Sequence, residues 1–265
     1  MLIFFAIALI IISSCAKVEC KISADCQQRA CTISKCENKK CAYTMQLNCC
    51  GNKLKESIEN GKPGNQCTCP DDYGKCEGKP KVKAGTRSEN ATYLQYLCNF
   101  DNQCVLGIDK EDVAPQNFLD TINLALFKAS AIVRYNHPFD VNRDSFELTI
   151  TLDDIGKDLV LPISLTKVKL LFNSEITRTE QLIAEEDIGS VLNGFGDKAI
   201  IRIQLNLNYR PQEIEESGGL RYLVDYAHKK QVKGRVINGT TQYTNETVRG
   251  TFSSPTKPVL FVRSS

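Results

Sequence analysis

The carboxyl-terminal part of the chain alternates apolar and polar residues with a period of two. The clearest apolar runs are Phe146–Leu152, Leu159–Leu165, Ile201–Leu207, Leu220–Tyr226 and Val259–Phe261. Because successive side chains of a strand point to opposite faces, each run predicts a strand with one buried face. Weaker alternation marks further candidate strands at Ala129–Tyr135, Val232–Ile237 and Thr240–Phe252. Seven to nine such strands predict an antiparallel β-sandwich over residues 109–265.

Turn sequences separate these strands. They lie at 193–197, where the sequence is Asn-Gly-Phe-Gly-Asp, at Ser217-Gly218-Gly219 and at Asn238-Gly239. Asparagine and glycine tolerate the positive φ angles that tight hairpin turns require. We therefore expect each of these sequences to lie between two strands.

The amino-terminal part, residues 17–108, has a different composition and predicts a separate module. Residues 17–83 are rich in Lys, Asn, Gln, Ser, Gly and Cys and poor in Leu, Val and Phe. Loops and short ribbons are expected here, with one helical turn near Leu54–Ile58, turns at 61–65 and 70–74, and a strand at Ala91–Leu97. Such a stretch buries too little apolar surface to offset chain entropy without cross-links.

All 13 cysteines lie between Cys15 and Cys104. Twelve remain when Cys15 is set aside: Cys20, Cys26, Cys31, Cys36, Cys41, Cys49, Cys50, Cys67, Cys69, Cys76, Cys98 and Cys104. An even number of cysteines in an exported chain predicts a disulfide framework. The neighbours Cys49 and Cys50 are expected to bind two different partners, and a Cys98–Cys104 bridge would close a hairpin. The remaining pairing does not follow from the sequence.

A metal site is the rival interpretation of these cysteines. Four of them recur every five residues from Cys26 to Cys41, and the Cys67-x-Cys69 pair would offer two thiolates. Structural zinc sites usually have two Cys-x2–4-Cys knuckles separated by a longer interval, often with histidine, rather than an even run of cysteines. The chain has no Cys-x-x-Cys and only two histidines, both outside the cysteine region. Disulfides are therefore favoured, and no metal or other cofactor is predicted.

Residues 1–16 indicate export. Leu2–Ile12 is almost entirely Leu, Ile, Phe and Ala. As a helix this run would extend about 17 Å, against roughly 30 Å of hydrocarbon, which suits a signal peptide better than a membrane span. Two ends fit the sequence: cleavage after Ala16, or a lipoprotein signal in which Cys15 carries the lipid. The expected location is the cell surface or the extracellular space.

The charge balance and the glycosylation sequences of the chain limit the classes of partner that we expect for it. The 33 basic and 31 acidic residues nearly cancel, and neither half of the chain has a strong positive excess. Nucleic acid is therefore not an expected partner. Three Asn-x-Thr sequons, at Asn90, Asn238 and Asn245, are candidate glycosylation sites and agree with export. Contact with a membrane is expected only through an amino-terminal lipid or anchor.

Three groups of residues are candidates for a chemical site. The Asp140-x-Asn142-x-Asp144 sequence resembles the start of a calcium loop but lacks its glycine and final glutamate, so a solvated loop is favoured. His228 lies three residues after Asp225, His137 stands apart, and no nucleophile elbow accompanies them. The acidic clusters 185–187 and 213–216 are expected in solvated loops. No catalytic residue is predicted.

The segment 26–76 resembles a recurrent module of exported archaeal surface proteins. The match rests on Asn48-Cys49-Cys50-Gly51-Asn52 and Glu59-Asn60-Gly61 and covers about a quarter of the chain. One departure is Lys53-Leu54-Lys55-Glu56, which replaces a cysteine and a glutamate that commonly follow Gly-Asn. The Pro138–Val141 sequence before a Phe-x-Leu-x-Ile strand is similar to Ig-like or arrestin-like sandwiches on such proteins. The resemblance implies an envelope protein of unknown ligand and assigns no catalytic residue.

These observations predict a mainly β protein with a disulfide-rich amino-terminal module and a carboxyl-terminal antiparallel β-sandwich, Ig-like or arrestin-like. The expected function is non-enzymatic: binding of an unknown protein or glycan at the cell surface, or an envelope-structural role. Two alternatives remain open, a secreted hydrolase or protease inhibitor and a surface assembly subunit.

Overall fold

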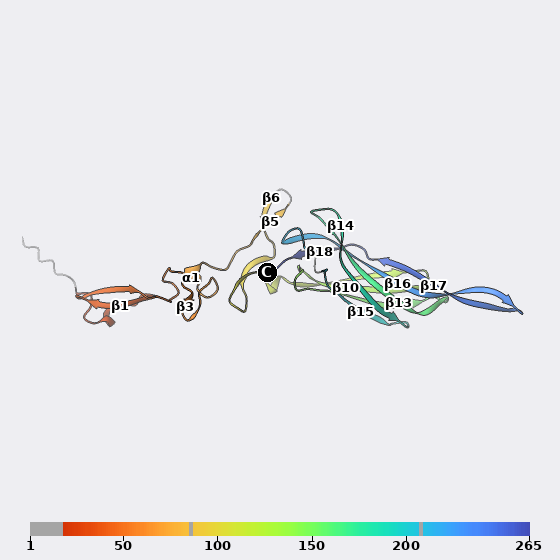
Figure 1. Ribbon diagram of the computed structural model, residues 1–265, viewed down its shortest axis with the longest axis horizontal. Helices are drawn as coiled ribbons and strands as arrows, with labels where there is room; N and C mark the ends of the chain where they lie inside the picture. Colours follow the sequence, from red (N-terminus) through yellow and green to blue (C-terminus); the bar gives the residue numbers. More distant parts are fainter. Residues whose placement is uncertain (1–17, 85–86, 207–208) are drawn as a thin grey trace, which may run out of the picture. The chain divides into compact units, whose positions relative to one another are not determined.

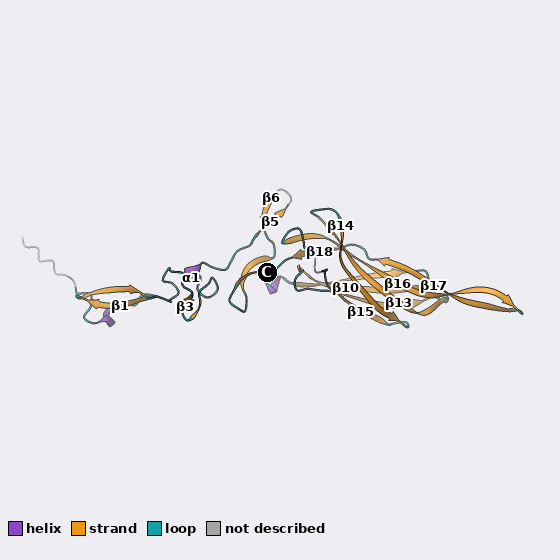
Figure 2. Ribbon diagram, viewed as in Figure 1, coloured by secondary structure: helices purple, strands orange, loops and turns teal. Residues whose placement is uncertain are grey.

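The computed structural model describes residues 18–84, 87–206 and 209–265 (Figure 1). The candidate export segment 1–16, with Cys15, lies outside the described residues, as does Leu207. Strands dominate the chain (Figure 2), which confirms the predicted mainly β fold. Within the described ranges, no helix combines the length and apolar character needed to cross a membrane.

The chain forms two compact units. The first comprises the described residues up to Cys76 together with Cys98–Cys104, and the second comprises the described residues of Glu77–Leu97 and Val105–Ser265. This division differs from the predicted boundary at residue 109. The hairpin tip at 98–104 belongs to the first unit because its two cysteines form disulfides there, while the segment before it is fastened to the sandwich.

The first unit consists of short strand pairs and single helical turns. Its elements are a 3-10 turn (Ser23–Asp25), β1 (Thr32–Glu37), β2 (Lys40–Met45), β3 (Ile58–Glu59), β4 (Lys62–Pro63) and α1 (Pro70–Tyr73). The helical turn predicted near Leu54–Ile58 is wrong, because this stretch is irregular and ends in β3. Helix α1 forms instead at a predicted turn, where Pro70 supplies the φ angle of a first helical position.

Six disulfides hold the first unit together. They are Cys20–Cys36, Cys26–Cys41, Cys31–Cys49, Cys50–Cys69, Cys67–Cys98 and Cys76–Cys104. The neighbours Cys49 and Cys50 have different partners, as predicted. The predicted Cys98–Cys104 bridge is wrong. A backbone hydrogen bond from Asn99 to Gln103 already closes that hairpin, whereas the observed bridges constrain separations of 31 and 28 residues.

The second unit contains a β-sandwich. One sheet has the order β15 (Lys198–Ile203), β12 (Phe146–Ile155), β10 (Phe127–His137), β9 (Ala114–Asn123). The other has the order β11 (Phe139–Asp140), β18 (Lys257–Val262), β16 (Glu215–Ile237), β13 (Leu159–Ser174), β14 (Glu180–Leu192), with β17 (Thr240–Ser253) also paired to β16. The pairings are antiparallel except for β11 with β18.

Smaller elements precede the sandwich. They are β5 (Lys81–Ala84), β6 (Arg87–Asn90), β7 (Leu94–Cys98), β8 (Cys104–Ile108) and a 3-10 turn (Lys110–Asp112). Strand β5 pairs with β6, and β7 pairs with β8. Ala91 and Leu94 are buried together with Val262 in a small core of their own.

The main core lies between the two sheets. Its fully buried residues come from strands of both sheets, as the period-two alternation predicts. The ring of Phe139 in one sheet stacks on that of Phe146 in the other, with centroids 4.2 Å apart, and Phe261 contacts both rings edge-on. The predicted sandwich is therefore confirmed, with slightly more strands than expected.

Two predictions about the sandwich, a turn at 217–219 and the placement of the acidic clusters in loops, are wrong. Ser217-Gly218-Gly219 is not a turn, because strand β16 runs through it without interruption from Glu215 to Ile237. A Cβ atom on Gly218 would lie 2.3 Å from the Phe172 ring, so glycine here permits close packing of the neighbouring strand. The acidic cluster 185–187, expected in a solvated loop, lies in β14 with its side chains exposed. The cluster 213–216 is not the solvated loop that the sequence predicts, because Glu215 and Glu216 lie in β16 and Glu216 is buried, where it accepts the Gln212 N–H.

The distal part of β16 forms a two-stranded ribbon with β17. Beyond Lys230, β16 pairs with β17 alone among the described strands (Figure 1). Asn238 and Gly239, with φ angles of 51° and 76°, form the turn that the sequence predicts. The side chains of Val236, Ile237 and Tyr243 are exposed on this ribbon.

Candidate functional site

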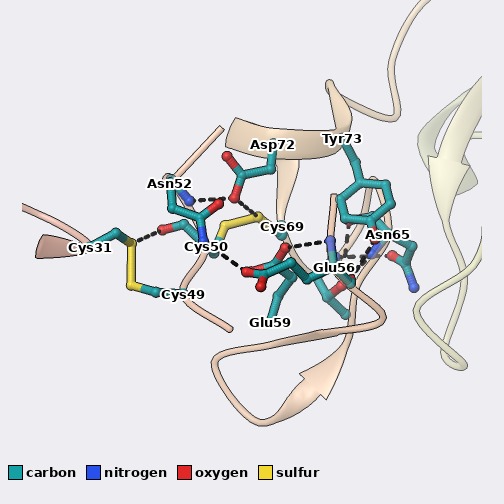
Figure 3. Close-up of a disulfide and its surroundings, with 12 residues drawn as sticks. Cys31, Cys49, Cys50, Asn52, Glu56, Glu59, Asn65, Cys69, Asp72 and Tyr73 are labelled. Atoms are coloured by element: carbon teal, nitrogen blue, oxygen red, sulfur yellow. Dashed lines mark hydrogen bonds between the residues drawn. A yellow bond between two sulfur atoms is a disulfide. The ribbon is translucent and has the colours of Figure 1, made fainter. Parts of the chain in front are cut away.

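The double-cysteine loop, residues 48–53, is fixed by two disulfides that leave from neighbouring residues. Cys49 is bonded to Cys31 before β1, and Cys50 is bonded to Cys69 at the start of α1 (Figure 3). The two partners lie in different segments of the unit, before β1 and at α1, so the two bonds restrain the loop from two sides. The backbone between the cysteines therefore has little freedom to move.

The backbone conformation of this loop explains its Asn and Gly residues. Asn48, Gly51 and Lys53 have φ angles of 56°, 105° and 69°. Asparagine enters the left-handed region more easily than most residues, and the value at Gly51 suits glycine alone. Replacing Gly51 would strain the loop even though a Cβ there meets only ordinary contacts.

Asp72 from α1 closes one side of the double-cysteine loop. Its Oδ2 accepts the Gly51 N–H at 2.6 Å, and its Oδ1 accepts the Lys53 N–H at 2.6 Å (Figure 3). Hydrogen bonds to a charged acceptor are about twice as strong as neutral ones. The single turn of α1 thus positions a carboxylate that holds two loop amides.

Glu56 closes the other side. Its Oε2 accepts the backbone N–H of Asn48 and the side-chain N–H of Asn52, each at 2.7 Å. Asn52 is buried, and its amide also donates to the Gln46 carbonyl at 3.0 Å. The Tyr73 hydroxyl donates to the Glu56 carbonyl at 2.6 Å, which links this side of the loop to α1. The loop is therefore held by hydrogen bonds as well as by sulfur.

Glu59 is the most deeply buried acidic residue near the loop, with 1 % of its surface exposed. Its Oε1 accepts the Glu56 N–H at 3.2 Å, while Oε2 has no hydrogen-bond partner among the described residues. Buried polar atoms are almost always paired in proteins. A shallow hollow of about 420 Å³ lies in the same unit, lined by Lys55, Asn65, Gln66, Tyr73, Gln103 and Cys104.

The candidate glycosylation residues lie on the surface of the second unit. Asn90 ends β6, Asn238 lies in the β16–β17 turn, and Asn245 lies in β17. All three side chains are exposed. Each sequon is thus accessible for modification, and two of them lie on the two-stranded ribbon.

The calcium-like sequence 140–144 leads into a turn before β12, as the sequence predicts, but this turn is solvated only in part, at Asn142 and Arg143. Asp140 is buried, and its carboxylate accepts the Ser264 hydroxyl and lies 3.5 Å from the Arg143 guanidinium. Asp144 accepts the Asp140 N–H at 2.9 Å, and Asn142 donates to the Ser264 carbonyl at 2.6 Å. Asp140 and Asn142 thus fasten the turn to Ser264 in the carboxyl-terminal segment, and Asp144 stabilises the turn itself.

The histidines and acidic clusters do not converge within the described residues. His228 lies buried on the inner face of β16, while Asp225 accepts hydrogen bonds from Thr251 and Lys169 on the outer side. His137 contacts the Tyr93 ring edge-on. Among the 185–187 cluster, Glu185 and Asp187 pair with Lys167, which lies on the neighbouring strand. The arrangement assembles no acid–base–nucleophile set from these groups.

The disulfide bonds also bear on whether these cysteines could bind a metal. Three groups of potential ligands occur among the described residues, Cys20 with Cys26 and Cys41, Cys67 with Cys76 and Cys98, and Cys50 with Cys69 and Asp72. Every cysteine in them belongs to a disulfide and so offers no thiolate to a metal.

No protein-family model matches the chain, and no curated protein matches it either. The double-cysteine loop, held by two disulfides and two carboxylates, is the candidate functional site.

Proposed function

We propose that this protein acts outside the cell as a non-enzymatic binding or envelope-structural protein, exported through residues 1–16. The observation that carries the proposal is the set of six disulfides in a unit with few buried apolar side chains. Disulfides form and persist in oxidising compartments, and small exported domains use them in place of a large core. Exposed sequons on the second unit are consistent with the same location.

The double-cysteine loop is suited to binding because it is rigid before any partner arrives. Rigidity reduces the entropy that a loop loses when it binds. Met45, Leu47 and Leu54 flank the loop in the sequence, and all three side chains are exposed. Exposed apolar side chains beside a fixed backbone favour a protein or a glycan ring as the partner. The proposed partner is therefore a protein or glycan at the cell surface.

The location is tested by labelling cysteines with a membrane-impermeant maleimide before and after reduction on intact cells of the source organism. We expect no labelling before reduction and twelve labelled cysteines after it. The mass of the amino-terminal peptide then distinguishes cleavage after Ala16 from lipid on Cys15. A cytosolic protein with free or zinc-bound thiols would contradict the proposal.

Binding is tested with the purified, labelled chain on cells of the source organism. We expect Leu47→Ser combined with Leu54→Ser to reduce binding at least tenfold, since both residues flank the loop. Ile33→Ser, at another exposed position of the same unit, is the matched control. Equal binding by the double variant and the unmodified chain would show that the surface beside the loop does not bind the partner.

The non-enzymatic part of the proposal has its own test. A panel of glycosidase and protease substrates, and of proteases to inhibit, is expected to give no effect. Robust turnover that is lost in His228→Gln, or potent protease inhibition, would support the alternative of a secreted hydrolase or inhibitor.

A second candidate function, an assembly subunit, is favoured by the ribbon of β16 and β17. Beyond Lys230 this ribbon carries exposed Val236, Ile237 and Tyr243. A ribbon with unpaired outer backbone groups can add a strand from another chain. Light scattering of the purified chain over a range of concentrations tests this function. Self-association that Val236→Lys abolishes would support it, and a monomer at all concentrations would contradict it.

A further inference from the structure

A lysine and an aspartate are buried in contact between the two sheets of the sandwich. Asp120 lies on β9, the edge strand of the four-stranded sheet, and Lys257 begins β18 in the other sheet. Lys257 Nζ lies 2.8 Å from Asp120 Oδ1 and 2.7 Å from Oδ2. The two side chains are only 5 % and 9 % exposed. The pair joins residues that are 137 positions apart.

Seven other ion pairs of the described residues are more accessible to water than this one. In each of the seven, at least one side chain is 32 % exposed or more. The Phe118 and Tyr222 ring centroids lie 5.8 Å and 5.7 Å from Lys257 Nζ. Removing two charges from water is costly, and their attraction often fails to compensate. An uncharged form of the pair avoids this cost.

Tyr222 adds a hydrogen-bond donor to the aspartate. Its hydroxyl donates to Asp120 Oδ2 at 2.6 Å, and its ring is almost fully buried. Burial, together with the neighbouring carboxylate, raises the pKa of Tyr222, so the hydroxyl keeps its proton. A donor fixed on one oxygen can stabilise negative charge that develops there during attack on the carboxyl carbon.

We propose that Lys257 and Asp120 join in an intramolecular amide bond. A proton first passes from the Lys257 ammonium to the Asp120 carboxylate, which leaves an amine and a carboxylic acid. The nitrogen lone pair then attacks Cγ and forms a C–N bond, while Tyr222 stabilises the oxygen that remains as the carbonyl. The other C–O bond breaks, and its hydroxyl leaves as water with a proton from the nitrogen. The reaction requires no oxidant, reductant or other reactant.

The fold favours this reaction in two ways. Nζ is held in hydrogen-bond contact with both carboxylate oxygens, so folding replaces the encounter of two separate molecules. A hollow of about 230 Å³ borders Asp120 and Tyr222, and Phe252 and Pro255 also line it, which provides space for the released water. The product is a neutral amide, which is less costly to bury than two charges.

The bond would supply the sandwich with a cross-link that its sequence otherwise lacks. Residues 105–265 contain no cysteine. Asp120 belongs to the first strand of the sandwich and Lys257 to the last, so the bond closes nearly the whole domain into one covalent loop. Unlike the disulfides of the first unit, this link would persist under reducing conditions.

Mass spectrometry of the purified full chain after complete reduction and alkylation tests the proposal. We expect a mass one water molecule below that of the linear chain, and a branched tryptic peptide that contains both Lys257 and Asp120. Lys257→Arg keeps the positive charge but removes the nucleophilic amine, so it is expected at the full linear mass. Should that variant fail to fold, the peptide map of the unmodified chain decides alone.

The outcomes separate clearly. Linear peptides carrying Lys257 and Asp120 at full mass would overturn the proposal, and so would a water loss at the exposed pair Lys128–Asp154 instead. Tyr222→Phe is expected to slow bond formation at least tenfold after refolding, measured by the faster migration of the linked chain on denaturing gels. Tyr226→Phe on the same strand is the matched control. Equal rates of bond formation in the two variants would show that Tyr222 takes no part in the reaction.

Discussion

The carboxylate of Glu215 accepts the backbone N–H of Thr92 at 2.7 Å, although 123 positions separate the two residues in the sequence. The same carboxylate accepts the N–H groups of Tyr93 and Leu94, each at 2.7 Å. Leu94 is fully buried in a small core with Ala91 and Val262. One side chain at the start of β16 therefore fastens the segment before β7 to the sandwich.

The first prediction concerns this contact. Glu215→Gln keeps the shape of the side chain but replaces a charged acceptor, so the three amides lose much of their hydrogen bonding. These hydrogen bonds are exposed or partly buried, so we expect a local loss of about 1–3 kcal/mol, the range for weakened hydrogen bonds to a charged group. Faster hydrogen exchange at residues 92–94 measures it. Glu213→Gln, two positions earlier, is the control, and equal exchange in the two variants would refute the assignment.

Most strands of the sandwich could be predicted, because apolar and polar residues alternate along a strand that has one buried and one exposed face. The apolar runs at 146–152 and 159–165 lie in β12 and β13 as expected, and their alternate residues are mostly buried or half-buried. Strand β14 was missed because the three consecutive acidic residues 185–187 interrupt the period-two alternation of apolar and polar positions. Strand β9 was missed because one of its inward positions holds Asp120, and a charged residue interrupts the apolar pattern.

Less of the candidate site than of the sandwich could be predicted from the sequence. Cysteine number and spacing predict disulfides but not their pairing, which depends on where distant segments meet. The Asn-Cys-Cys-Gly-Asn sequence marks the double-cysteine loop, and its positive φ angles suit Asn and Gly. Asp72 carried no local signal, because it lies in a stretch interpreted as an ordinary turn and its partners are 19 to 21 positions away.

A second prediction follows from Asp72. Asp72→Asn replaces one acceptor oxygen by a donor, so Gly51 and Lys53 cannot both keep their hydrogen bonds. We expect the unit to lose about 1–3 kcal/mol of stability, with faster exchange of the two loop amides. Asp71→Asn is the matched control, since Asp71 is exposed on the same turn of α1. Protection of Gly51 that is unchanged in Asp72→Asn would contradict the assigned role.

The third prediction concerns the disulfide between Cys50 and Cys69. Replacing both residues by serine removes a link across 19 positions without leaving a free thiol. We expect a loss of about 2–5 kcal/mol in the first unit, because the link restricts its unfolded state. Limited proteolysis should cut near residues 48–53 first. The melting temperature of the sandwich is expected to stay constant, and a parallel decrease there would contradict the independence of the two units.

The last prediction concerns pH and His228. This ring is 6 % exposed, packs against the Phe127 and Tyr226 rings, and has no hydrogen-bond partner for either nitrogen among the described residues. Burial lowers the pKa of His228 below its ordinary value of 6.5. The nearest titratable ring, Tyr226, has a pKa raised by burial and stays neutral in the same range.

Unfolding exposes His228 and restores its ordinary pKa, so below pH 6.5 the unfolded chain binds a proton that the folded chain resists. This residue therefore contributes full stability above pH 6.5, and the contribution falls as the pH decreases towards the lower folded-state pKa. His228→Phe fits between the two rings and removes the titration. Urea unfolding of the sandwich between pH 5 and pH 8, each about a unit and a half from the ordinary value, should show a smaller dependence on pH in this variant. His137→Phe controls for the other histidine, and an unchanged pH dependence in His228→Phe would show that the ring is not the group responsible.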